Sequence, residues 1–78
     1  MRVSIPDASG WEIFYFEGDP TPQLDGPDNV NVVYYAKDER WPEHLHIEHD
    51  AYHDGTVSVT IPVAAIRAFM EALSRRDV

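Results

Sequence analysis

The histidines are the residues of this chain best suited to chemistry, and they lie close together in the sequence. All four fall within residues 44–53, and Glu48 and Asp50 lie among them. Imidazole titrates near neutral pH and is the most common side-chain ligand of transition metals. The cluster therefore indicates either a metal site or a surface whose charge changes with pH.

If residues 44–53 form an extended strand, their side chains alternate between two faces. One face then carries His44, His46, Glu48, Asp50 and Tyr52. Two imidazoles and one carboxylate form a partial coordination shell for zinc or nickel, so His44, His46 and Glu48 are the candidate metal ligands. The alternative interpretation is a solvated polar strand face that holds no cofactor.

The turn that follows this strand decides which of its faces points inward. A two-residue turn would direct Glu48 toward the core, whereas a three-residue loop, 53–55, pairs Tyr52 with Thr56 and leaves Glu48 in solvent. We prefer the three-residue loop because a buried carboxylate is costly. His49 then faces inward, where we expect a neutral, hydrogen-bonded side chain.

The apolar pattern of the first 61 residues predicts antiparallel strands. They are expected at residues 2–5, 11–16, 30–37, 44–53 and 57–61. The stretch 18–29 holds three prolines and two glycines, which predicts an irregular loop. The sheet should therefore contain four or five strands.

One helix is predicted at the C-terminus. Apolar residues recur there with helical spacing, at Ile66, Phe69, Met70 and Leu73. We expect a helix over about residues 62–75 that folds back over the sheet to bury this stripe. The sequence thus predicts an α+β fold in a single small acidic domain, residues 1–78: an antiparallel β-meander of four or five strands with one C-terminal α-helix packed on one sheet face.

A single helix can cover only one face of such a sheet, yet both faces are expected to be apolar. The strand at 11–16 places Trp11 and Ile13 on one face and Phe14 on the other. On one interpretation the uncovered face meets a partner or a second copy. On the other, the long loop folds over it with Leu24 as its anchor.

The chain has a formal net charge of -8 at pH 7. Such a field repels nucleic-acid phosphates and anionic lipids and favours a basic protein partner. The residues expected to contact this partner are Asp19, Asp25, Asp28, Asp38, Glu39, Trp41, Glu43, Glu48, Asp50 and Tyr52. The carboxylates in this set would imitate the phosphates of a nucleic acid. The alternative interpretation is that acidity only keeps a small protein soluble.

Other classes of protein are disfavoured. The chain has no cysteine, no apolar segment long enough to cross a membrane and no secretory signal, so we expect a complete, soluble, cytoplasmic protein. It also lacks motifs for nucleophilic or nucleotide-dependent catalysis, so we expect no enzyme activity.

Three hypotheses about function follow. The first is a non-enzymatic protein–protein interaction module, a small acidic inhibitor or accessory regulator of the kind that mobile elements encode. The second is a metal-binding or metal- or pH-sensing module that uses His44, His46 and Glu48. The third is a homodimer that forms through the open sheet face.

Overall fold

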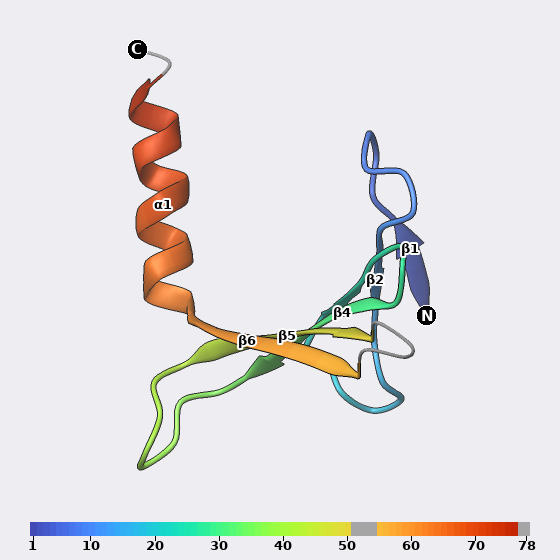
Figure 1. The fold of residues 1–78 in the computed structure, drawn as a ribbon, viewed down its shortest axis with the longest axis horizontal. Coiled ribbons are helices and arrows are strands. Elements are labelled where there is room, and N and C mark those ends of the chain that lie inside the picture. Colours follow the sequence, from blue (N-terminus) through green and yellow to red (C-terminus); the bar gives the residue numbers. More distant parts are fainter. Residues whose placement is uncertain (51–54, 77–78) are drawn as a thin grey trace.

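The computed structural model describes residues 1–50 and 55–76, which form one antiparallel sheet and one helix (Figure 1). The strands are β1 (Arg2–Ser4), β2 (Glu12–Phe14), β3 (Gln23–Asp25), β4 (Val30–Tyr35), β5 (His44–Asp50) and β6 (Thr56–Pro62), and the helix is α1 (Val63–Arg76). Each strand pairs with the next one along the chain, so the sheet order is β1-β2-β3-β4-β5-β6. The predicted α+β meander with a C-terminal helix is confirmed, with six strands in the described residues.

The additional strand is β3, which lies within the stretch that was expected to be an irregular loop. Leu24 at its centre is opposite Ile13 of β2 and Val32 of β4. The strand is only three residues long and lies between Pro22 and Pro27, so its own composition favours a turn. Pairing with two neighbouring strands overrides this preference. Leu24 is therefore part of the sheet and does not anchor a loop above it.

The strand register sorts the side chains onto two faces with different chemistry. The apolar face is defined by a row that crosses all six strands, Val3, Ile13, Leu24, Val32, Ile47 and Val59, together with Tyr34, Leu45, Val57 and Ile61. The acidic face is defined by the adjacent row, Ser4, Glu12, Asp25, Asn31, Glu48 and Ser58. Within β2, Ile13 lies on the apolar face and Phe14 on the acidic face, as expected.

The pairing of β5 with β6 preserves the expected faces but not the expected register. Thr56 pairs with Asp50, whereas the three-residue loop required Tyr52. A shift of two residues leaves every side chain on its original face. Glu48 accordingly lies on the acidic face, as expected, but its neighbour in β6 is Ser58, whereas the three-residue loop required Thr60. Tyr52 and the turn itself lie outside the described residues.

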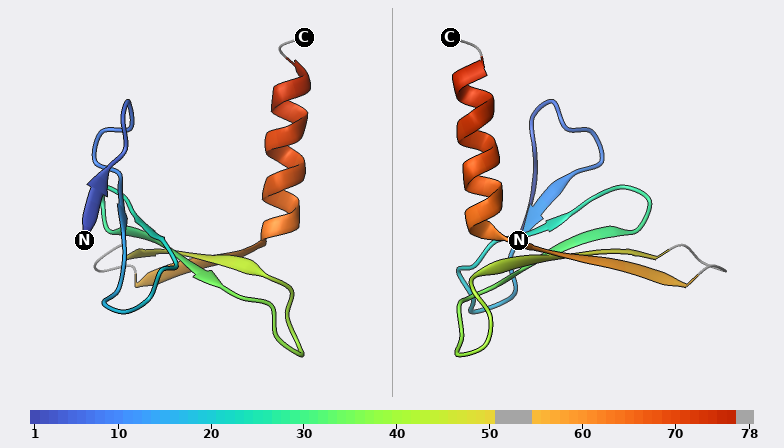
Figure 2. Two further views of the ribbon diagram at one scale, coloured as in Figure 1. Left: turned by 180° about the vertical axis from the view of Figure 1, so that it is seen from behind. Right: turned by 60° about the vertical axis from the view of Figure 1, so that its left-hand side comes forward.

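The helix does not fold back over the sheet. It begins at Val63, directly after Pro62 at the end of β6, and contacts the neighbouring parts of β5 and β6. It then rises away from the sheet, while the hairpin of β1 and β2 rises on the same side at the other end (Figures 1 and 2). None of its residues is buried, so the expected burial of the helical stripe is not observed within one chain.

Candidate functional site

The candidate metal ligands lie on one side of β5, but their ring nitrogens already have other partners. His44 Nδ1 lies 2.8 Å from the carbonyl oxygen of Pro42, to which it donates, and its ring stacks on Tyr35. His46 Nε2 lies 3.0 Å from Glu48 Oε1. The strand therefore places the three side chains on the face expected of them and joins two of them to each other.

This arrangement does not form a recognisable coordination shell. Among residues 1–50 and 55–76, no group of three or more histidine, cysteine or acidic side chains is positioned to hold a metal ion. Of the remaining histidines, His53 lies outside these ranges. His49 lies on the apolar face between Val30 and Val57 but is exposed, so the expected buried, hydrogen-bonded histidine is not found.

The predicted partner-binding residues do not form one continuous surface. Asp25 and Glu48 lie on the acidic face, and Asp50 extends the same side of β5. Arg2 Nη1 lies 2.9 Å from Asp25 Oδ2 and 3.6 Å from Glu12 Oε2. The guanidinium of Arg2 also lies 4.9 Å from the centre of the Phe14 ring. The single cation Arg2 thus pairs with both carboxylates at the β1 end of the acidic row.

The loop between β4 and β5 carries a second group of these residues, Asp38, Glu39 and Trp41, all of them exposed. This loop falls on the opposite side of the sheet from α1 (Figure 2). Asp38 Oδ1 accepts hydrogen bonds from the backbone N–H groups of Trp41, at 2.7 Å, and Arg40, at 2.8 Å. These bonds, the one from Trp41 first, lower the pKa of Asp38. The Asp38 carboxylate therefore shapes the loop as well as charging it.

Two further acidic residues lie in other turns. Asp19 Oδ1 accepts a 2.9 Å hydrogen bond from the backbone N–H of Thr21 in the loop between β2 and β3. Asp28 lies in the tight turn between β3 and β4 with a φ of 58°. Aspartate tolerates this left-handed conformation better than most residues. Both side chains are exposed, and both turns depend on the local chemistry of aspartate.

Glu43 lies on the other side of the sheet, at the base of α1. The hydroxyl of Tyr34 donates a hydrogen bond to the Glu43 carboxylate, and Arg67 Nη1 lies 3.5 Å from Glu43 Oε1. The hydrogen bond to Glu43 raises the pKa of Tyr34, and desolvation and the nearby negative charge act in the same direction. Glu43 therefore braces the helix and is separated from the other acidic candidates.

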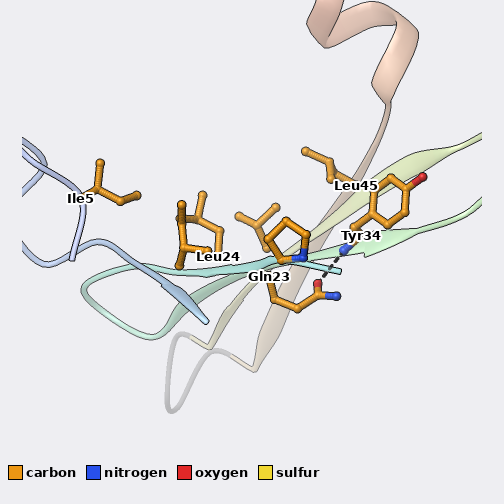
Figure 3. A pocket seen from close by; sticks show the side chains of 8 residues that line it. Ile5, Gln23, Leu24, Tyr34 and Leu45 are labelled. Atoms are coloured by element: carbon orange, nitrogen blue, oxygen red, sulfur yellow. Dashed lines mark hydrogen bonds between the residues drawn. The ribbon is translucent and has the colours of Figure 1, made fainter. Parts of the chain in front are cut away.

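An apolar hollow of about 310 Å³ lies above the centre of the sheet, and the sequence did not reveal it. It is lined by Ile5, Ile13, Pro22, Gln23, Leu24, Val32, Tyr34 and Leu45. Figure 3 shows Ile5, Leu24 and Leu45 pointing to the same side, whereas the Gln23 side chain turns away to accept a 2.7 Å hydrogen bond from the Tyr34 backbone. The available signal was Leu24, a lone apolar residue between two prolines.

Comparison with known proteins gives no family assignment. The chain matches no protein-family model, no curated protein and no solved structure. Within the described part of the chain, no helix has the length and apolar character needed to cross a membrane. The functional argument therefore depends on the surfaces of this structure alone.

Proposed function

We propose that this chain is a non-enzymatic protein-interaction module that binds a basic protein surface through its acidic face. The carrying observation is the row of Glu12, Asp25 and Glu48, which crosses β2 to β5 on one side of the sheet. Arg2 is the only cationic side chain that the described strands place on this side. The row is therefore a net negative stripe on an exposed sheet.

The spacing of this stripe favours additive electrostatics. Neighbouring strands lie about 4.8 Å apart, so the distance from β2 to β5 is about 15 Å. The screening length at physiological salt is about 8 Å, so a cation over the middle of the stripe, about 7 Å from either end, is attracted by all three carboxylates. The same field disfavours nucleic acid and anionic lipid as ligands. A small cytoplasmic inhibitor or accessory regulator of a basic protein fits this chemistry.

The test compares two triple variants with the same change of net charge. The first, Glu12→Gln with Asp25→Asn and Glu48→Gln, neutralises the acidic face. The matched control neutralises exposed carboxylates elsewhere and consists of Asp7→Asn, Glu17→Gln and Glu71→Gln. Thermal unfolding verifies that both variants retain the fold, because exposed ion pairs such as Arg2–Asp25 contribute little to stability.

Each variant serves as bait for proteins from the native cell, at about 50 and about 500 mM salt. We expect the parent and the control to retain a basic protein at low salt and to release it at high salt, and the acidic-face variant to retain little at either. Equal retention by both variants would contradict the proposal. Retention that is lost only with a chelator would favour the metal-dependent alternative.

A further inference from the structure

Two apolar surfaces of this chain are left without cover. On α1, Phe69 is 62% exposed and Met70 is 57% exposed. On β6, the apolar-face residues Val57 and Val59 are 58% and 52% exposed. In the described residues only Val32 and Gln23 are buried. Apolar side chains on adjacent elements that all remain in solvent indicate a missing partner surface.

The size of the uncovered surface agrees with that of an obligate dimer. The accessible surface is 6416 Å², whereas a compact chain of this mass exposes about 4,800 Å². The radius of gyration is 14.4 Å, against about 11.5 Å for a compact chain of this length. The excess is about 1,600 Å² per chain, or about 3,200 Å² for a pair, which lies within the range of obligate homodimers.

The junction between β6 and α1 prevents the helix from covering its own sheet. No residue separates Pro62 from Val63, whereas a strand and a helix that reverse direction need a connection of about 2–6 residues. The proline ring also restricts φ at the junction. The backbone N–H of Val63 donates a 3.0 Å hydrogen bond to the carbonyl of Glu43, whose side chain pairs with Arg67. The first turns of α1 are thus held in the outward direction.

The apolar face offers a hollow in which an outward helix of a second copy can lie. An α-helix of 14 residues is about 21 Å long and about 10 Å wide. A second hollow, lined by Arg67 at the base of the helix, shares Tyr34 and Leu45 with the hollow above Leu24. The apolar face is therefore open from its centre to the base of the helix. At the far end the Trp11 ring packs against Gly26, where an added Cβ would lie 2.7 Å from it. The β1–β2 hairpin therefore forms a fixed end wall.

The helix differs in charge from the rest of the chain. The helix carries Arg67, Arg75 and Arg76 but only Glu71, so it is cationic although the whole chain is acidic. Nearly all the other acidic residues lie in the strands and loops. The cationic helix is therefore attracted at long range to the acidic body of a second copy, although the acidic row itself lies on the face opposite to the proposed contact.

We propose that two copies of this chain form a two-fold dimer in which each α1 places its apolar stripe on the apolar face of the other. The contact is isologous, so it closes after two chains. The connection without a loop favours exchange of the helix between chains over its return to the same chain. This inference does not depend on the proposed binding of a basic partner, which uses the opposite face of the sheet.

The first test is the oligomeric state of the full chain by sedimentation equilibrium from micromolar to millimolar concentration. We expect a dimer, with a thermal midpoint that rises with concentration. Phe69→Glu should raise the dissociation constant at least about 100-fold, as expected for a central aromatic contact. The matched control is Ala68→Glu, an exposed position on the other side of the helix, which should leave the dimer unchanged. A parent chain that stays monomeric at every concentration would overturn the proposal.

The second test locates the contact and does not depend on how Phe69→Glu folds. Because the chain has no cysteine, single cysteines can be added without a background. A Leu24→Cys chain mixed with a Phe69→Cys chain should yield a crosslinked heterodimer under mild oxidation, and a Leu24→Cys chain mixed with an Ala68→Cys chain should not. A dimer that forms without this selective crosslink, or that persists in Phe69→Glu, would be joined elsewhere, for instance along the β6 edge. That result would overturn the exchange of helices.

Discussion

The two faces of the sheet are built from neighbouring residues but depend on different physical effects. In β4, Val32 faces the apolar side and is 9% exposed, whereas Asn31 faces the acidic side in solvent. The apolar face gains stability from area removed from water, so it is incomplete without cover. The acidic face acts through charge, which works at a distance and is screened by salt. Their difference suggests one surface for self-association and one for a basic partner.

The largest predicted effect is obtained by placing the same charge on each face. Val32→Asp should lower the free energy of unfolding by about 3–5 kcal/mol, because the carboxylate would be buried without a partner. Asn31→Asp, one residue away on the acidic face, should cost at most about 0.5 kcal/mol, through repulsion from Glu48 and Asp25. Urea unfolding of both variants measures the difference. Similar costs would show that the two faces are not distinct in burial.

Gln23 is the exception to the simple division, because it is polar and buried. Its Oε1 accepts a hydrogen bond from the backbone N–H of Tyr34, beyond the last paired residues of β3 and β4. Gln23→Met should leave this N–H without an acceptor and cost about 1–3 kcal/mol. Hydrogen exchange at the backbone amide of Tyr34 should accelerate in Gln23→Met. It should remain slow in the control Asn31→Ala, which removes the side-chain amide of an exposed residue. Unchanged protection in Gln23→Met would contradict this role.

The two sides of the sheet should also limit stability at opposite ends of the pH range. The pKa of Tyr34 is raised in the fold, so its contribution is complete below the ordinary tyrosine pKa and is lost as pH rises through the raised value. Asp38, on the other side, has a lowered pKa. Its contribution is present above the ordinary aspartate pKa and is lost as pH falls through the lowered value.

Thermal midpoints measured against pH separate these two contributions. Tyr34→Phe should flatten only the alkaline limb of the profile, and Asp38→Asn, which keeps an acceptor for the loop, should flatten only the acid limb. If the alkaline limb is unchanged in Tyr34→Phe, the Tyr34–Glu43 hydrogen bond is not the cause of the alkaline loss of stability. If the acid limb is unchanged in Asp38→Asn, Asp38 is not the cause of the acid loss.

The smallest effect is expected for an ion pair on the polar side of α1. Arg75 Nη1 lies 2.8 Å from Glu71 Oε1, one helical turn away, and both side chains are well exposed. Glu71→Gln should cost about 0.3–0.5 kcal/mol, and less at high salt. Asp25→Asn, which weakens the pair with Arg2 on the acidic face, should be similarly mild. A large loss from Asp25→Asn in thermal unfolding would show that the acidic face is also structural.

Much of the local structure could be predicted because it depends on residues close together in the sequence. The spacing of Ile66, Phe69, Met70 and Leu73 predicted the helix, and its bounds differ from those expected by one residue at each end. Alternation placed Glu48 and His49 on opposite faces, and this holds although the register was wrong by two residues. A shift by an even number of residues cannot change the face.

The candidate site was less predictable because its parts come from separate elements. The sequence grouped Glu43 with Glu48, yet Glu43 bonds to Tyr34 at the helix base and Glu48 bonds to His46 on the acidic face. β3 was missed because three residues between prolines carry too little local signal, and its pairing with β2 and β4 supplies the rest. The hollow that contains Leu24 was missed with it.

The sequence by itself determined the types of the elements, the side of each strand on which a residue lies and the strongly acidic charge. Periods of two and of 3.6 residues are set by backbone geometry, so the order of apolar and polar residues along the chain is enough to reveal them. Only the tertiary structure decided that β3 joins the sheet, which strand residues pair and that α1 points away from the sheet of its own chain. These outcomes depend on contacts between distant residues and on the junction without a loop at Pro62, and no local pattern encodes them.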